Sequence, residues 1–254
     1  MTRRLRRTLL LTVLLLHAAS IRALAQPPAP APGQPPPPPP PQEGTAEASF
    51  IGTSGNTSTQ AIGLGGELTV RRAPWVYNTK AVYVRNEDED NLKAESFAAL
   101  FRASRTLTER VSAYGRYDFL RNAFAGIDSR NTISGGLEYL LIKPEPHNLK
   151  INAGVGYTNE QRAVGEDLST AEFLTGALYK WTISPTADFT DDFQFNVSFS
   201  DAGDWRNANI ASVTAKLTTL LSLKASNTVR YVHQPVFGFE TTDTITALAL
   251  VLKF

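Results

Sequence analysis

The sequence of 254 residues contains no cysteine, which excludes disulfide bonds, thiolate nucleophiles and thiolate metal sites. Histidine is almost as rare, with three residues. Long apolar runs are missing as well, because Leu9 to Leu16 is too short to span a bilayer as a helix. The mean hydropathy of −0.18 would not suggest a membrane protein. Any membrane character must therefore come from a pattern other than long apolar helices.

The first 25 residues have the organisation of a secretory signal peptide. Four arginines precede the short apolar run, and Ala23-Leu24-Ala25 forms an A-x-A site, which predicts cleavage after Ala25. The adjacent arginines leave a twin-arginine export signal as an alternative. Removal of this segment takes away five arginines and no acid, so the formal net charge changes from +1 to 20 − 24 = −4. This acidic balance argues against nucleic-acid binding.

Residues 26–44, QPPAPAPGQPPPPPPPQEG, are dominated by proline. This composition favours a stiff polyproline II segment of about 3.1 Å per residue and cannot form a core. We interpret it as a periplasmic spacer. A docking segment for peptidoglycan or a periplasmic partner is the alternative.

From residue 45 onward, apolar and polar residues alternate with a period of two, which is typical of β-strands. The five remaining prolines all fall between the periodic segments, where a missing N–H does no harm to a ladder. The pattern predicts twelve strands, at 45–53, 58–71, 75–85, 92–104, 108–120, 129–142, 148–161, 169–182, 188–200, 206–217, 220–233 and 241–253.

These strands are longer than the five or six residues usual in soluble sandwiches and suit tilted membrane-spanning strands. An open sheet would leave two long edges unpaired, whereas a closed barrel leaves none. We therefore predict a closed antiparallel transmembrane β-barrel of the bacterial outer-membrane type, with about twelve strands; a soluble sandwich is the alternative. In the final TALALVLKF, lipid would cover the leucine face. Phe254 resembles the signal that the barrel-assembly machinery recognises.

Aromatic residues gather near the two ends of the predicted strands, as amphipathic rings do at membrane interfaces. The predicted interface aromatics include Trp75, Tyr77, Tyr139, Tyr179, Trp181, Tyr231 and Phe254. Outer-membrane lipid and lipopolysaccharide are the partners that this arrangement implies.

Four stretches of the sequence resemble a bacterial family known as domain of unknown function 481, in the order that the family has them. They are FIGTSGNTSTQAIGLGGEL (50–68), YGRYDFLRNAFAGIDSRNTISGGLEYLLI (114–142), LKINAGVGYTNEQ (149–161) and the final TDTITALALVLKF. The resemblance covers residues 45–254 and leaves the proline-rich segment out. Members of the family are often labelled as salt-induced outer-membrane proteins. The resemblance implies an outer-membrane barrel and no particular activity.

Few motifs point to chemistry. SGNTS (54–58) has the composition of a hairpin turn, with a ligand contact at the barrel mouth as the alternative. NEDEDN (86–91) lacks the spacing of a calcium loop and is interpreted as a solvated loop, with cation bridges to lipopolysaccharide as the alternative. His147 and His233 have no serine placed to form a hydrolase site, so we expect no catalytic residue, metal or cofactor, and an outer-leaflet lipid hydrolase stays a remote alternative.

The face opposite the lipid is rich in charge. Strand parity directs both signs of charge into the lumen, with an excess of basic groups. Besides Glu67 and Glu160, the proposed lining consists of Lys80, Arg102, Arg116, Asp118, Glu138, Lys150, Glu172, Lys180, Lys216, Lys224 and Arg230. Unpaired charges cannot lie in a dry interior. Either they line water, which predicts a narrow passive channel for small hydrophilic solutes, or they pair across the lumen and close a structural barrel that supports the envelope under salt or osmotic stress.

Overall fold

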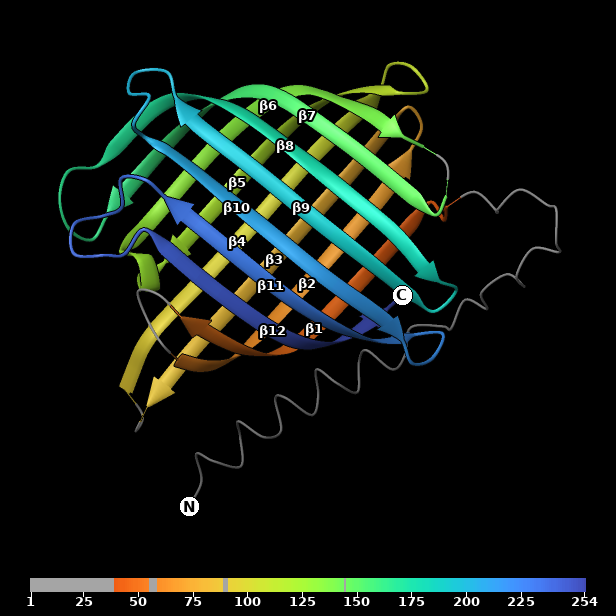
Figure 1. The fold of residues 1–254 in the computed structure, drawn as a ribbon, viewed down its shortest axis with the longest axis horizontal. Coiled ribbons are helices and arrows are strands. Elements are labelled where there is room, and N and C mark those ends of the chain that lie inside the picture. The colour runs from red at the N-terminus through yellow and green to blue at the C-terminus, as the bar shows by residue number, and fades with distance from the viewer. Residues whose placement is uncertain (1–38, 55–58, 89–90, 144) are drawn as a thin grey trace, which may run out of the picture. The chain divides into compact units, whose positions relative to one another are not determined.

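The computed structural model describes residues 39–54, 59–88, 91–143 and 145–254, and these form twelve β-strands and one short 3-10 helix (Figure 1). The elements are β1 (Gln42–Ser54), β2 (Thr59–Arg72), β3 (Trp75–Asp88), β4 (Asn91–Thr106), β5 (Val111–Asn122), η1 (Ala123–Ala125), β6 (Ile127–Ile142), β7 (His147–Arg162), β8 (Leu168–Ser184), β9 (Ala187–Ser198), β10 (Trp205–Lys216), β11 (Leu221–Val232) and β12 (Thr242–Lys253). The predicted signal peptide lies outside the described residues, as does most of the spacer.

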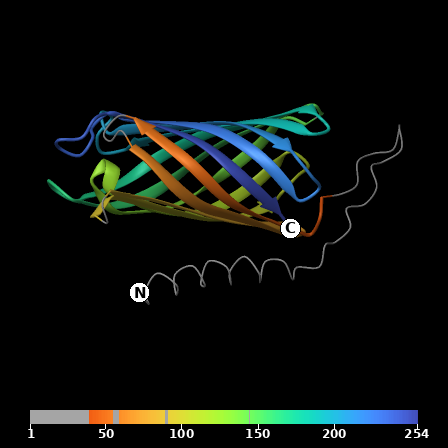
Figure 2. The same ribbon diagram turned by 90° about the horizontal axis from the view of Figure 1, so that it is seen from below.

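Each strand pairs antiparallel with its neighbours in sequence, and β1 pairs with β12, so the sheet closes into a barrel. In the closing pair, Phe50 lies opposite Leu248 and Thr45 opposite Lys253. Figure 2 shows the strands inclined to the long axis of the barrel. The prediction of a closed antiparallel barrel with twelve strands is confirmed. No helix in the described part of the chain is long and apolar enough to cross a membrane.

Strand boundaries differ from the predicted ones by at most three residues, and local contacts explain the largest differences. β1 begins at Gln42, because Arg71 of β2 forms an ion pair with Glu43 and its backbone N–H donates to the carbonyl of Pro41 at 2.7 Å. β5 begins at Val111, because the Thr108 hydroxyl accepts from the Val111 N–H at 3.0 Å and holds the preceding residues in a turn.

The last strand shows how the two faces of the sheet differ. Leu248 and Leu250 point outward and are 51% and 50% exposed, whereas Ala249 and Val251 point inward and are buried. Because successive side chains of a strand point to opposite faces, the register of the ladders assigns every strand residue to the outer or the inner wall. The outer wall is apolar over most of its area, which fits contact with lipid.

The two ends of the barrel are built differently. At the end that holds the start of β1 and the end of β12, here called the terminus end, the strands are joined by two to four residues. At the opposite end, here called the far end, the β9–β10 and β11–β12 connections contain six and nine residues. Residues 55–58 of SGNTS and the side chains of NEDEDN lie outside the described part of the chain.

Candidate functional site: the charged lumen

All eleven residues of the proposed lining lie on the inner wall by strand register. Register pairs place Arg102 beside Arg116, Glu138 beside Asn152, and Thr214 beside Lys224. The same alternation puts the other seven inward: Lys80, Asp118, Lys150, Glu172, Lys180, Lys216 and Arg230.

Near the terminus end, the lumen is wet. The side chains of Lys150 and Lys180 are 40% and 52% exposed although both point inward, and Leu178 between them is 40% exposed. Lys180 lies 3.6 Å from Asp188 of the next strand, and Lys216 donates to the carbonyl of Pro185 at 3.0 Å. These long, loosely held contacts leave the lysines accessible to water.

Further into the barrel, an arginine and an aromatic ring share one site. The Arg102 guanidinium lies 4.2 Å from the ring centre of Tyr114 and donates to Glu138 at 2.7 Å. Glu138 also accepts from Lys150, at 3.2 Å. The Tyr114 hydroxyl fits over Gly154, where an added Cβ would lie 2.7 Å from that oxygen and 2.4 Å from a backbone carbonyl. Glycine is therefore required here because two backbones and a ring approach closely.

Arg116 reaches across the lumen from β5 to β9. Its guanidinium makes two hydrogen bonds to Asp118, of 2.7 and 2.6 Å, and a third, of 3.3 Å, to the Gln194 amide oxygen. On another part of the wall, the Lys224 ammonium donates to both carboxylate oxygens of Glu47, at 3.0 and 3.1 Å. Arg116 and Gln194 bridge the middle of the lumen, since they join β5 and β9, which are not neighbours in the sheet.

Near the far end, the charges form a buried network. The side chain of Glu172 is 0% exposed and accepts from Arg206 at 2.7 and 2.8 Å and from Asn196 at 2.8 Å. Glu160 is 1% exposed and pairs with both Arg130 and Arg162. Every buried carboxylate oxygen of this network has a partner, which is the condition for holding charge away from water.

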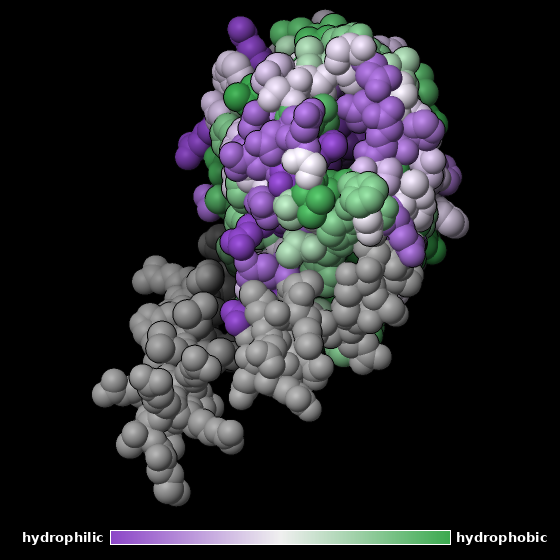
Figure 3. Space-filling model, turned by 90° about the vertical axis from the view of Figure 1, so that its left-hand side faces the viewer, coloured by the Kyte–Doolittle hydropathy of each residue, from purple (hydrophilic) through white to green (hydrophobic). Residues whose placement is uncertain are grey.

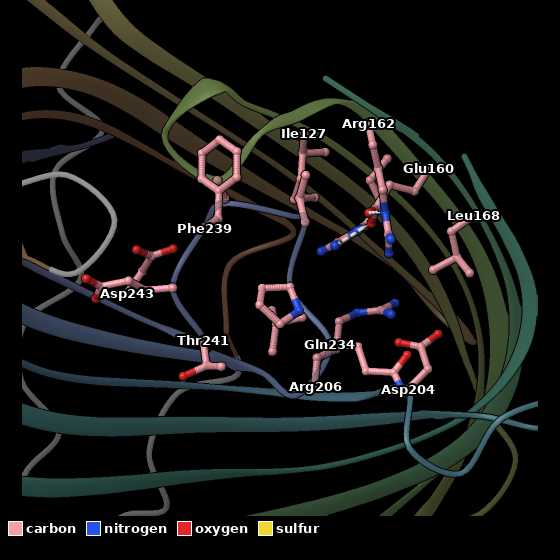
Figure 4. A pocket seen from close by; sticks show the side chains of 16 residues that line it. Ile127, Glu160, Arg162, Leu168, Asp204, Arg206, Gln234, Phe239, Thr241 and Asp243 are labelled. Carbon is pink, nitrogen blue, oxygen red and sulfur yellow. Dashed lines mark hydrogen bonds and ion pairs between the residues drawn. The ribbon is translucent and has the colours of Figure 1, made fainter. Parts of the chain in front are cut away.

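The β11–β12 connection folds over the far end and lines a pocket there (Figure 4). Val236 is 5% exposed, and the ring of Phe239 packs so closely on Gly126 that a Cβ there would lie 2.4 Å from it. Gln234 donates to Asp201 at 3.1 Å, which ties this connection to the β9–β10 connection. The pocket has a cavity volume of about 30 Å³ and is open to solvent. Figure 3, which faces this end, shows hydrophilic residues gathered around the mouth.

Asp204 lines this mouth from the β9–β10 connection, directly before the first residue of β10. It is 8% exposed, and burial raises the pKa of its carboxyl above the usual range. Arg206 opposes this shift, whereas Glu172 adds to it. Figure 4 shows Asp204 beside Arg206 and Gln234 at the edge of the pocket.

The structure also points inward several charges that the proposed lining leaves out. They are Glu47, Arg130, Arg162, Asp188, Asp192, Arg206 and Asp243. Alternation puts Glu47 on the face opposite Phe50, and Asp188 and Asp192 on the face opposite Phe193. The sequence alone could therefore have identified these three acids as inward. Arg130 and Arg206 stand at the ends of their predicted strands, where a register shift such as that between Ile127 and Ser129 makes parity unsafe.

The interface aromatics named above lie on the outer wall, apart from Phe254, which follows β12 and is 51% exposed. Tyr179 and Trp181 both stack on His147, with ring centres 5.9 Å apart in each case. At the far end, Trp205 stacks on Tyr231 at 4.9 Å and on His233 at 5.2 Å. Among the described residues, neither histidine hydrogen-bonds to a serine: His147 contacts the Tyr179 hydroxyl and His233 the Gly203 carbonyl.

Residues 46–254 match the family described as "Protein of unknown function, DUF481". The chain belongs to this family. A comparison with curated proteins gives no match. Among solved structures, the NanC porin is similar with a TM-score of 0.58 at 9% identity, covering 82% of this chain and all of the porin. The translocator domain of the autotransporter NalP from Neisseria meningitidis reaches 0.49 at 10% identity, covering 84% of this chain and 88% of the domain. At 9% identity, the likeness to the NanC porin shows the fold, which is that of an outer-membrane barrel.

Proposed function

We propose that this DUF481 protein is a narrow passive channel for small hydrophilic solutes and has no enzymatic activity. The observation that carries the proposal is the inner wall, where charged and amide side chains follow one another from Lys180 through Arg116 and Gln194 to Arg206. The NanC likeness supports an outer-membrane barrel in which such a wall encloses a lumen.

The paired charges of Arg116 and of Lys224 keep some contact with water. The side chains of Arg116 and Asp118 are 19% and 30% exposed, and those of Lys224 and Glu47 are both 23% exposed. Ion pairs that keep such exposure can rearrange when a solute or ion passes, because water replaces a lost partner. Pairs with no exposure cannot do so without a large desolvation penalty.

A closed structural barrel is the second candidate, and the far end favours it. Glu160 and Glu172 are almost fully buried there, and the β11–β12 connection covers the mouth. In that case the charges would hold the walls together, as a packing network that supports the envelope under salt or osmotic stress.

The remaining features of the proposal concern export and partners. We propose that the chain is exported by a signal peptide cleaved after Ala25, is inserted by the barrel-assembly machinery that reads Phe254, and contacts lipopolysaccharide through its outer wall. The proline-rich segment would act as a periplasmic spacer.

Conductance of the refolded 26–254 protein in a planar bilayer under a salt gradient tests the channel. Reproducible unitary steps are expected, with a reversal potential that indicates a slight anion preference. In Arg116→Ala combined with Lys224→Ala, the reversal potential should shift toward cations, because Asp118 and Glu47 lose their counter-charges. An absence of conductance from protein shown to be folded would favour the closed barrel.

A further inference from the structure

The outer wall of β9 to β12 carries polar side chains where lipid is expected. Asn209 donates to the carboxylate of Asp191 at 3.2 Å, and Asn227 donates to the hydroxyl of Thr246 at 3.0 Å. All four share the outward face, since Asn227 lies between Ala225 and the 37%-exposed Val229 in the alternation of β11. These four residues are called the polar band below.

The polar band lies between the two aromatic belts. Along their strands, Asn209 stands four positions from Trp205 and Asn227 four positions from Tyr231, both at the far end. Asp191 stands two positions from Phe189 on the terminus side. A strand tilted by about 40° climbs about 2.5 Å per residue, so the two asparagines lie about 10 Å inside the far belt, within an apolar zone about 25 Å tall.

Polar groups in the hydrocarbon zone are unfavourable unless they have polar partners outside lipid. On the opposite side of the barrel, Ile133, Leu137 and Val155 are exposed by 56–68%, and the outward Asn131 of that wall is paired with the Tyr117 hydroxyl at 2.8 Å. The amides of the polar band retain hydrogen-bonding capacity beyond the bonds that they make within the wall.

Strand tilt brings Asn209, Asn227 and Thr246 of the polar band to similar depths, whereas Asp191, paired with Ala211, lies nearer the terminus end. Rows of paired residues climb from the terminus end of β8 toward the far end of β2, as in the row Trp181, Phe189, Val213, Ala225, Leu248, Phe50 and Ile62. Asn227 is paired with Ala211 on one side and with Thr246 on the other. From Thr246 to Ala211 the row moves about 6 Å toward the terminus end. Asn209, two residues before Ala211 in β10, lies about 5 Å back toward the far end. Asn209 and Thr246 therefore lie at nearly the same depth, on either side of Asn227.

We propose that the polar band is the interface through which two copies of this chain associate in the membrane. Both copies have the same orientation in the bilayer, so a two-fold axis along the membrane normal brings residues of equal depth together. With the axis beside β11, Asn227 meets the partner's Asn227, and Asn209 meets the partner's Thr246. Asparagine both donates and accepts, so such a surface complements itself.

The neighbours of the band allow the two walls to approach. Ala211 and Ala225 flank Asn227, and small residues at a membrane interface let backbones come close enough for side chains to hydrogen-bond. Lipid tails offer no such partner. The proposal does not depend on whether the lumen conducts.

Single-cysteine cross-linking in isolated outer membranes tests the interface, because the full-length chain has no cysteine of its own. Under a membrane-permeant oxidant, Asn227→Cys is expected to give a covalent dimer as the major species. Ile133→Cys, which is outward and mid-strand on β6, is the matched control and should stay monomeric. Equal cross-linking of both variants, or of neither, would overturn the proposal.

A mixing experiment tests the geometry. Asn209→Cys alone and Thr246→Cys alone should cross-link poorly, whereas membranes that contain both variants should give a mixed dimer, because the axis places each residue against the other. Separately, Asn227→Leu should keep the heat-resistant folded barrel and lower the dimer fraction measured by mass in detergent. Poor cross-linking in the mixture together with an unchanged dimer fraction in Asn227→Leu would overturn the proposed arrangement.

Discussion

In the terminus-end half of the lumen, the side chains of Lys150 and Lys180 are 40% and 52% exposed, whereas in the far-end half those of Glu160 and Glu172 are 1% and 0% exposed. Both halves carry ion pairs on the same inner wall. In the wet half, an ion pair contributes little to stability, because water screens it and replaces a lost partner. In the dry half, each charge depends on its partner. Ion pairs of the same kind therefore suit the passage of ions in the wet half and the closure of the wall in the dry half.

The largest expected effect is a loss of stability in the dry, far-end half of the lumen. Glu172→Gln removes the carboxylate to which the buried Arg206 guanidinium donates, so the free energy of unfolding should fall by about 3–5 kcal/mol. Asp188→Asn, which removes the partner of exposed Lys180, is the control and should cost less than about 1 kcal/mol. Urea unfolding in lipid vesicles measures both. Similar losses in the two variants would show that the halves do not differ.

The next largest effect is a change in conductance when the β11–β12 connection, which covers the far end, is altered. Phe239→Ala removes the ring that packs on Gly126 and should raise the unitary conductance, because the mouth is then less closed. Phe237→Ala, in the same connection but 84% exposed, should leave the conductance unchanged. Single-channel recording compares the two. A rise in conductance in both variants, or in neither, would mean that the Phe239 ring does not obstruct the passage of ions.

On the wet side, a change in selectivity without a change in stability is expected. Lys150→Ala combined with Lys180→Ala removes two positive charges from a hydrated wall, so the reversal potential under a salt gradient should shift toward cations. The free energy of unfolding in urea should stay the same within about 0.5 kcal/mol. A stability loss without a shift in reversal potential would mean that this half is packed like the other.

The smallest expected effect is a dependence on pH at the far end. Burial raises the pKa of Asp204, so the folded state binds its proton more tightly than the unfolded state does. Stability from this group is therefore greatest below its unfolded pKa and is lost as pH rises through the folded value. Asp204→Asn removes this dependence. Its melting temperature relative to wild type should increase between acidic and neutral pH, and a constant difference would contradict the assignment.

The barrel could be predicted from the sequence because the side-chain period of a strand is two. In β12 and β9, alternation fixes both the strand and its faces, and length then favours a closed transmembrane sheet. The inward residues of the wet half, such as Lys150 and Lys180, follow from the same alternation. No contact across the lumen is needed to place them.

The dry half could not be predicted in the same way. Arg130 and Arg206 stand near strand ends, where a register shift can exchange the two faces. The contact of Phe239 with Gly126 joins two connections more than a hundred residues apart, and the residues of the β11–β12 connection have no period to read. Closure of the far end therefore depends on tertiary packing, which a single sequence does not reveal.

Thiol accessibility along the inner wall tests the central claim most directly. Leu178→Cys places a thiol in the exposed half, and Thr158→Cys places one where the native side chain is 0% exposed and hydrogen-bonded to Thr132 at 2.7 Å. In folded protein, a charged, water-soluble thiol reagent should modify Leu178→Cys rapidly and leave Thr158→Cys unmodified. Equal rates would contradict a lumen that is wet near the terminus end and closed by buried ion pairs near the far end.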